Sequence, residues 1–295
     1  MEHPPLVSIL IPTLGRSREL IDTVATLAKQ TRLPMELIVM DQNQPSLPEV
    51  DAYLAQFSWV RHIHAPTPGY ASNLNALLQA ARGEIVIYLD DDILADPKLV
   101  ESHLKNYASN QPKLAAVAGR VEQRLGDKPP ESITELGRYH RFTGRVVANF
   151  NAQVRKAAQV GIGANMSFKK SALLEIGGFD EGFGGNGFRC ESDAFLRLGE
   201  KGYQIVFDPE AQVKHLMAPS GGCRVPDKAK LNFHFVKNGL RLYRKHSPVA
   251  LLPFFTVQLF FYSAAKAVYQ ANPKVLGLAL RAISEGLSES IEGHS

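Results

Sequence analysis

Residues 83–92 are Gly-Glu-Ile-Val-Ile-Tyr-Leu-Asp-Asp-Asp, an apolar run that stops at three consecutive aspartates. Its β-branched and aromatic residues are typical of a strand buried on both faces. Acids at the carboxyl end of such a strand lie where open α/β sheets usually bind ligands. Side chains alternate along an extended chain, so Asp90 and Asp92 point the same way and together suit Mg²⁺ or Mn²⁺ with a substrate phosphate. An acidic surface turn is the alternative interpretation.

The residues on both sides of this segment predict strands that alternate with helices. Apolar runs predict strands at 6–12, 36–40, 59–64, 114–121, 160–169 and 203–207. Apolar residues recur at helical spacing within 18–30, 50–57, 69–82 and 97–107. Such alternation implies right-handed crossovers between parallel strands. We therefore expect an α/β fold, with a mostly parallel central sheet flanked by helices.

Composition sets broad limits on the class of protein. The 295 residues are enough for one large α/β domain with an appendage, or for two small domains. A formal charge of +4 fits either a phosphate-bearing ligand or an anionic membrane surface. Two cysteines imply no disulfide framework, and residues 1–5 do not resemble a secretory signal. We expect a cytoplasmic protein, at the inner face of the cell membrane if it contacts lipid.

A second predicted strand also ends on an acid, Asp41. No Gly-rich dinucleotide fingerprint and no phosphate-binding P-loop follow the first predicted strand, so carboxylates and a metal would have to hold any nucleotide. The Asp41 carboxylate could accept hydrogen bonds from a base or from ribose hydroxyls. The alternative is an aspartate that only shapes a turn.

Three segments in order resemble the nucleotide-binding half of the family 2 glycosyltransferases. They are VSILIPTLGR at 7–16, ELIVMDQN at 36–43 and GYASNLNALLQAARGEIVIYLDDD at 69–92. The resemblance extends over about residues 6–245. It implies an inverting enzyme with the A-type glycosyltransferase fold, a nucleotide-diphospho-sugar donor and a divalent metal, Mg or Mn.

The resemblance also assigns roles to residues of the first half. Pro12, Thr13 and Asp41 would line the base and ribose pocket, Asp90 would contact the ribose, and Asp92 would bind the metal. Gln42 stands where the family commonly has a second aspartate. A glutamine both donates and accepts hydrogen bonds, so the preferred base stays open.

The second acidic group is Cys190-Glu191-Ser192-Asp193, at the start of a predicted helix. Carboxylates in a first turn are favoured by the helix dipole, which is the purely structural explanation. In the family, the matching acids supply the general base that deprotonates the acceptor hydroxyl. Glu191 aligns with this base and Asp193 with the acid that orients the site. A glutamate replaces the usual aspartate, so the assignment between the two stays open.

His215 ends a predicted strand and a glycine-containing loop follows it, residues 218–224. The resemblance gives His215 a metal or phosphate contact. Arg224 could make a bidentate contact to the diphosphate, and the loop would then close over the leaving group. The alternatives are a structural histidine and a flexible solvent loop. Residues 122–159, which lack a clear pattern, would flank the acceptor or form a surface excursion.

The tail combines basic and apolar segments. Seven basic residues occur between Arg224 and Lys245, and no charged residue occurs in 249–265. The apolar run is shorter than the roughly 20 residues of a spanning helix. This order fits a helix lying in a membrane interface, and the alternative is a helix packed on the catalytic domain or in a dimer.

These observations predict a catalytic domain at 1–245, with a nucleotide-sugar half at about 1–121 and an acceptor half at 122–245. A helical tail follows at 246–295. The expected reaction is metal-dependent transfer of a sugar, with inversion, to a hydroxyl of a glycan or lipid-linked acceptor in polysaccharide biosynthesis. No nucleic-acid partner is expected. The donor sugar, the acceptor and the oligomeric state stay open.

Two other functions are compatible with parts of the sequence. A nucleotidyltransferase shares the sheet and the carboxylate–metal chemistry, but residues 13–16 are too short for its usual Gly-rich basic loop. A non-catalytic sugar-nucleotide-binding homologue is left open by Gln42 and Glu191.

Overall fold

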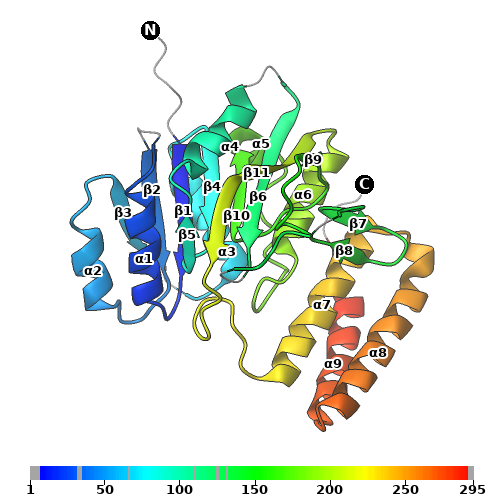
Figure 1. Ribbon diagram of the computed structural model, residues 1–295. Coiled ribbons are helices and arrows are strands. Elements are labelled where there is room, and N and C mark those ends of the chain that lie inside the picture. Colours follow the sequence, from blue (N-terminus) through cyan, green and yellow to red (C-terminus); the bar gives the residue numbers. More distant parts are fainter. Residues whose placement is uncertain are drawn as a thin grey trace.

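A computed structural model gives the structure of the protein (Figure 1). It describes residues 7–31, 35–65, 67–108, 111–123, 126–130 and 132–291. Residues 1–5, on which the expectation about a secretory signal depends, lie outside this description. So do Leu6, the first residue of the predicted first strand, and residues 292–295 at the end of the predicted tail.

A nine-stranded sheet forms the centre of the molecule, with the order β3-β2-β1-β4-β10-β6-β11-β5 and with β9 paired to β11. Its first four strands are parallel: β1 (Val7–Thr13), β2 (Met35–Asp41), β3 (Val60–His64) and β4 (Ile85–Leu89). The helices that connect or follow them are α1 (Arg18–Leu27), α2 (Pro48–Leu54), α3 (Tyr70–Ala80) and α4 (Leu99–Ala108). The predicted α/β fold class is confirmed.

The sheet becomes mixed beyond β4. Strand β10 (Asn165–Lys169) lies antiparallel between β4 and β6 (Leu114–Glu122). Strand β11 (Gln204–His215) is parallel to β6, and β5 (Ile93–Ala95) and β9 (Lys156–Ala157) pair antiparallel with β11. The chain reaches β10 from β6 through the segment 122–159, whose described residues form no helix, so this connection lacks the crossover helix that usually joins parallel strands.

Two hydrophobic cores cover the two faces of the sheet. In β1, Ile9 and Ile11 face one core while Leu10 faces the other, as the period of two requires. Helices α1, α2 and α4 cover the first face. Helices α3, α5 (Lys170–Glu175) and α6 (Cys190–Glu200) cover the second. Because both faces are covered, the strands are almost continuously apolar.

Three features differ from the sequence-based expectation. Helix α7 (Lys228–His246) and the short strand β5 were not predicted. The strand predicted at 203–207 continues to His215 as β11, and residues 208–210 lie inside it at a register irregularity. The irregular segment 122–159 contains the hairpin of β7 (Arg138–His140) and β8 (Arg145–Val147).

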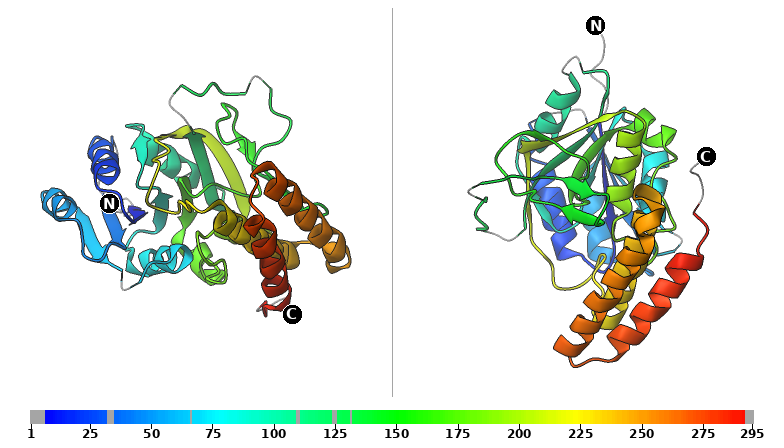
Figure 2. Two further views of the ribbon diagram at one scale, coloured as in Figure 1. Left: turned by 90° about the horizontal axis from the view of Figure 1, so that it is seen from below. Right: turned by 90° about the vertical axis from the view of Figure 1, so that its right-hand side faces the viewer.

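The C-terminal helices form a unit that projects from the sheet (Figures 1 and 2). It consists of α7, the 3₁₀ turn η1 (Val249–Leu251), α8 (Leu252–Tyr269) and α9 (Lys274–Ser288). Their shared core contains Val236, Leu240, Tyr243, Phe255, Leu259, Ala279 and Ala282. The predicted helical appendage is therefore present, and α7 is part of the same helical core.

Ion pairs hold α7 against the sheet domain. Arg241 and Lys245 both bind the Asp180 carboxylate, at 2.8 and 2.7 Å. Asn238 donates to the carbonyl oxygen of Gly184 at 3.2 Å. Helix α7 thus belongs by its contacts to both the sheet domain and the helical unit.

The packing of α8 gives a first prediction. Phe255 is buried and stacks on Tyr243 of α7, with ring centroids 4.0 Å apart and an interplanar angle of 9°. We expect Phe255→Ala to lower the free energy of unfolding by about 3–5 kcal/mol, because it leaves a cavity between α7 and α8.

The adjacent Phe254 is 73% exposed and is the matched control. Phe254→Ala should change the free energy of unfolding by no more than about 0.5 kcal/mol. Denaturant titration followed by circular dichroism measures both, and equal losses would contradict the packing described.

Candidate active site

A cleft of about 710 Å³ opens at the carboxyl ends of the parallel strands. Its lining includes Pro12 near the end of β1, the aspartates after β4, His215 at the end of β11 and Glu191 in the first turn of α6. The loop between β11 and α7, yellow below the sheet in Figure 1, contributes Arg224. Residues far apart in the sequence therefore meet in one cavity.

The three aspartates after β4 point in two directions. Asp91, which also belongs to the cleft lining, accepts hydrogen bonds from Thr13 Oγ1 at 2.6 Å and from the Arg16 guanidinium. Asp90 and Asp92 turn the other way, toward His215: the His215 Nε2 atom lies 3.6 Å from Asp90 Oδ2 and 3.0 Å from Asp92 Oδ1. The expected alternation of the side chains is confirmed.

Asp90, Asp92 and His215 form a group whose ligand atoms all lie within 4.8 Å of one another. The antiparallel pairing of β11 with β5 places His215 opposite Ile93, next to Asp92. Gln123 Oε1 lies 3.3 Å from His215 Nδ1 and orients the ring. The donor set of two carboxylates and one imidazole is chemically suited to Mn²⁺.

The two carboxylates of this group have different pKa values. Burial raises the pKa of Asp90 to about 7. Burial also disfavours the charge of Asp92, but the hydrogen bond with His215 and the charges of His215 and Arg16 outweigh it and lower the pKa of Asp92. The backbone N–H of Ala218 adds a hydrogen bond to Asp92 Oδ2 at 2.9 Å.

Arg16 connects the aspartates to the loop after β11. Its Nη1 lies 2.9 Å from Asp92 Oδ1, and its Nε donates to the carbonyl oxygen of Ser220 at 2.9 Å. The backbone N–H of Gly222 donates to the carbonyl oxygen of Leu14 at 2.7 Å. The loop is thus attached to the turn that follows β1. Gly221 and Gly222 both have positive φ, at +74° and +55°, which the tight path requires.

Glu191 faces the cleft from the start of α6. Burial raises the pKa of its carboxyl group, although the nearby Arg189 charge works in the opposite direction. Arg189, which precedes the helix, has a φ of +75°. A carboxylate with a raised pKa at the edge of a cavity can take a proton from a bound hydroxyl.

Asp193, the other acid of this motif, is absent from the described lining of the cleft. It is fully buried, and its Oδ1 lies 2.7 Å from Lys245 Nζ and 2.8 Å from His246 Nε2. Its Oδ2 accepts a hydrogen bond from Arg197 Nε at 2.7 Å. That Asp193 orients the site stays a prediction; in the structure its charge holds α7 on α6.

Thr13 and Asp41 are likewise not part of the described cleft surface. Thr13 supports Asp91 from below, and Asp41 is fully buried between β2 and β3. Gln42 does line the cleft, but its Oε1 accepts from Gly69 N at 3.0 Å and from Asn73 Nδ2 at 2.9 Å. Its amide thus fixes the start of α3.

Sequence reasoning missed several residues of the cleft, among them Arg16, Tyr70, Gln123 and His234. Arg16 lies in the first quoted segment, next to the turn glycine Gly15, and this position was the only signal for it. Tyr70 fits against Gly187, whose φ of +65° and missing side chain leave room for the ring. His234 comes from the unpredicted helix α7.

Comparison with known proteins identifies this arrangement. Residues 8–177 match the family model described as glycosyl transferase family 2. The chain belongs to this family. It is therefore a glycosyltransferase, and the alternative of a nucleotidyltransferase is set aside.

Curated relatives of this family 2 glycosyltransferase include enzymes with different acceptors. The glucosyl-dolichyl phosphate glucuronosyltransferase of Haloferax volcanii is 27% identical over 71% of this chain and 68% of its own length. The validoxylamine A glucosyltransferase of Streptomyces hygroscopicus subsp. limoneus is 26% identical over 63% of this chain and 46% of its own length.

A solved structure has a similar fold. The mannosyltransferase PcManGT from Pyrobaculum calidifontis, in complex with GDP-Man and Mn²⁺, superposes with a TM-score of 0.60. The match covers 98% of this chain and 77% of that chain, at 17% sequence identity. It confirms the A-type fold of this family 2 glycosyltransferase.

The Asp193 cluster gives a second prediction. We expect Asp193→Asn to lower the free energy of unfolding by about 3–5 kcal/mol, because it leaves buried cations without their partner. The neighbours lower the pKa of Asp193, so its stabilisation is present above the unfolded-state pKa near 3.8 and is lost as the pH falls through the lower folded value. The stability difference between wild type and Asp193→Asn should therefore shrink below about pH 4.

Denaturant titrations at a series of pH values test this. Asp22→Asn is the control, because the Arg18–Asp22 pair is exposed and its atoms are 4.0 Å apart. It should change stability by less than about 1 kcal/mol. A pH-independent difference for Asp193→Asn would show that the cluster does not act through charge.

Proposed function

We propose that this enzyme transfers a sugar from a nucleotide-diphospho-sugar to a hydroxyl of a glycan or lipid-linked acceptor, with inversion and with Mg²⁺ or Mn²⁺. The observation that carries the proposal is the convergence of Asp90, Asp92, His215 and Glu191 on one cleft. The dolichyl phosphate in the name of the Haloferax relative supports a lipid-linked acceptor. The GDP-Man and Mn²⁺ in the Pyrobaculum complex support the donor class and the metal.

Asp92 and His215 would hold the divalent ion, together with Asp90, which also comes close to His215. The ion would neutralise charge on the diphosphate leaving group. Asp90 would also contact the ribose of the donor, since it lines the same cleft. Pro12 would form part of the wall against the nucleoside.

Glu191 is the proposed general base. In-line displacement at the anomeric carbon requires the acceptor hydroxyl to lose its proton as it attacks, and Glu191 is part of the cleft lining. Asp193 cannot compete for this role while both of its oxygens bind cations. Of the two acids, Glu191 is therefore the one that we propose as the base.

Arg224 is proposed to contact the diphosphate. Its Nε donates to the carbonyl oxygen of Ala218 at 3.0 Å, so the guanidinium is held at the mouth of the cleft. Thr13 and Asp41 would act indirectly. Thr13 positions Asp91, and Asp41 accepts from Asn43, whose Oδ1 in turn accepts from Gly15 N at 2.7 Å.

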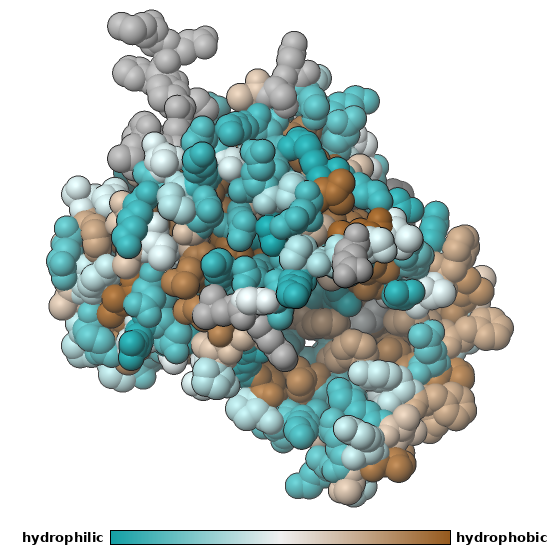
Figure 3. Space-filling view, in the orientation of Figure 1, coloured by the Kyte–Doolittle hydropathy of each residue, from teal (hydrophilic) through white to brown (hydrophobic). Residues whose placement is uncertain are grey.

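We further propose that the helical tail contacts a membrane peripherally and that the chain divides functionally at about residue 245. One helix among the described residues, Val249–Tyr269, is long and apolar enough by length and composition to cross a membrane, with a mean hydropathy of 1.4 and 17% of it buried. Seven of its apolar side chains are between 48% and 90% exposed: Val249, Phe254, Val257, Phe261, Tyr262, Val268 and Tyr269. Figure 3 shows apolar residues gathered over this part of the surface.

Part of the basic stretch before α8 is used in ion pairs within the protein. Arg241 and Lys245 of the basic stretch are buried in ion pairs with Asp180. Lys237 binds Glu285 of α9 and Glu289, the residue that follows α9, at 3.4 and 2.9 Å. The exposed apolar face of α8, and not the basic stretch, is thus the main support for membrane contact.

The third prediction concerns transfer. We expect Asp92→Ala and Glu191→Gln each to lower kcat by at least about 100-fold, because one removes a metal ligand and the other the proton acceptor. Release of nucleoside diphosphate from candidate donors, with Mn²⁺ and an acceptor extract, measures this. Unchanged melting temperatures establish that both variants are folded.

Near wild-type turnover in either variant would overturn its assignment. Glu181→Gln, an exposed acid outside the described cleft lining, is the matched control and should keep full turnover. A wild-type protein that binds donors but releases no diphosphate would instead be a non-catalytic homologue.

The fourth prediction concerns the tail. Replacing the exposed Phe254 and Phe261 by serine should reduce flotation with anionic liposomes, since the helix loses the apolar area that enters the interface. Leu174→Ser, an exposed apolar position on α5, is the control and should float like the wild type. Equal flotation of all three proteins would exclude the α8 face as an anchor.

A further inference from the structure

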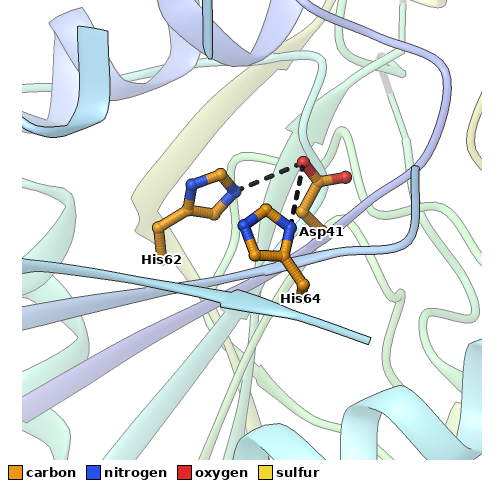
Figure 4. Close-up of side chains that lie close together, drawn as sticks. All are labelled: Asp41, His62 and His64. Atoms are coloured by element: carbon orange, nitrogen blue, oxygen red, sulfur yellow. Dashed lines mark hydrogen bonds and ion pairs between the residues drawn. The ribbon is translucent and has the colours of Figure 1, made fainter. Parts of the chain in front are cut away.

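A second group of ligating side chains lies at the ends of β2 and β3, formed by Asp41, His62 and His64. The two histidines are separated by one residue on β3, so their rings lie on the same side of the strand. The parallel pairing of β2 with β3 places Asp41 opposite His64. Figure 4 shows both rings beside the Asp41 carboxylate.

The three side chains are close enough to share one ion. Asp41 Oδ2 lies 3.3 Å from His62 Nε2 and 4.0 Å from His64 Nδ1, and all the ligand atoms are within 4.8 Å of one another. The histidine rings have centroids 4.5 Å apart. In a tetrahedral zinc site the ligand atoms lie about 2.0–2.1 Å from the ion. The three side chains would need to move only slightly closer together to reach this geometry.

We propose that Asp41, His62 and His64 bind a divalent transition metal of the Zn²⁺ type, at a site separate from the Asp90–Asp92–His215 group. Two imidazoles and one carboxylate favour Zn²⁺ over Mg²⁺, which prefers oxygen ligands. The side chain of His64 is 53% exposed while that of Asp41 is fully buried. The site is therefore open to solvent on one side, and three protein ligands leave a position for water.

The surrounding residues orient each ligand as a metal site requires. His62 Nδ1 lies 3.1 Å from Asp51 Oδ1, and Asp51 Oδ2 accepts from Ser46 Oγ at 2.7 Å. Asp41 Oδ1 accepts from Asn43 N at 2.8 Å and from Asn43 Nδ2 at 2.6 Å. These bonds occupy His62 Nδ1 and Asp41 Oδ1 and turn His62 Nε2 and Asp41 Oδ2 toward the common centre.

The position of His62 between two carboxylates adds a separate argument. A neutral imidazole carries only one N–H, so it can donate to Asp51 or to Asp41 but not to both. A cation bound at Nε2 would satisfy both carboxylates, with Nδ1–H donating to Asp51. A metal at Nε2 is thus one arrangement that satisfies both carboxylates, and it uses the ring nitrogen that faces Asp41 and His64.

Metal binding by the full-length protein tests the inference without reference to transfer. The chelator-treated protein is titrated calorimetrically with Zn²⁺ in excess Mg²⁺, and Co²⁺ is added separately to record its visible absorption. Wild type should bind Zn²⁺ at this site and give a Co²⁺ spectrum with imidazole ligation. His215→Ala should retain this binding, since it removes a ligand of the other group.

Two variants probe the site directly. Asp51→Asn, which alters only the support of His62, should weaken Zn²⁺ binding by about 10–100-fold, and His64→Ala, which removes a ligand, should weaken it further. His140→Ala is the control, because His140 is also partly exposed and beside a carboxylate, at 3.1 Å from Glu135. Melting curves show that each variant is folded.

An equal Zn²⁺ affinity in wild type and His64→Ala would overturn the proposal and leave Asp41, His62 and His64 as a hydrogen-bonded group. Loss of binding in His215→Ala alone would also overturn it, by assigning the bound ion to the other cluster. Neither result bears on the proposed transfer reaction, which depends on Asp92 and Glu191.

Discussion

The compensation of buried negative charge at the end of β4 is the constraint on which the cleft depends. Three adjacent aspartates repel one another, and Asp91 and Asp92 are nearly inaccessible to solvent. Arg16 lies between these two carboxylates, and His215 approaches Asp92 from the opposite side. Since a buried charge without a partner is strongly unfavourable, the turn after β1 and the end of β11 must both lie at this point.

The same principle explains how the C-terminal helices are attached. Asp193 and Asp180 are held by cations from α7, and His246 also binds Glu200 of α6 at 2.6 Å. These pairs fix α7 beside the cleft, where His234 joins its lining. Asp193, which the resemblance aligns with an acid that orients the site, thus makes ion pairs that hold two helices together. Glu191, two residues earlier in the same helix, faces the other way because α-helical positions two apart lie on different sides.

The helical unit beyond α7 has two distinct surfaces. Its inner surface is a packed core between α7, α8 and α9, with Phe255 stacked on Tyr243. Its outer surface on α8 exposes several aromatic and aliphatic side chains. Contiguous exposed apolar surface on a folded protein marks a site of interaction. Three basic residues of α7, Lys237, Arg241 and Lys245, are directed inward by their ion pairs.

The sequence by itself determined the α/β class, the first four parallel strands and the acids at their carboxyl ends. These features depend on local periodicity and on residue type, and both can be recognised within a segment of about ten residues. Membership of the family followed from the same segments. Six of the site residues that the sequence suggested line one cleft: Pro12, Asp90, Asp92, Glu191, His215 and Arg224. Those at strand ends meet there because strand ends in a parallel sheet lie at one edge, and the roles of all six stay predictions.

Only the tertiary structure decided which acids face that cleft. The motif left the assignment between Glu191 and Asp193 open, and their different surroundings come from Lys245 and His246, more than fifty residues away. The insertion of β10 in the antiparallel sense, the role of Arg16 and the pairing of Asp41 with His62 likewise depend on contacts between distant segments. Burial and charge compensation are properties of the packed chain, so local sequence cannot specify them.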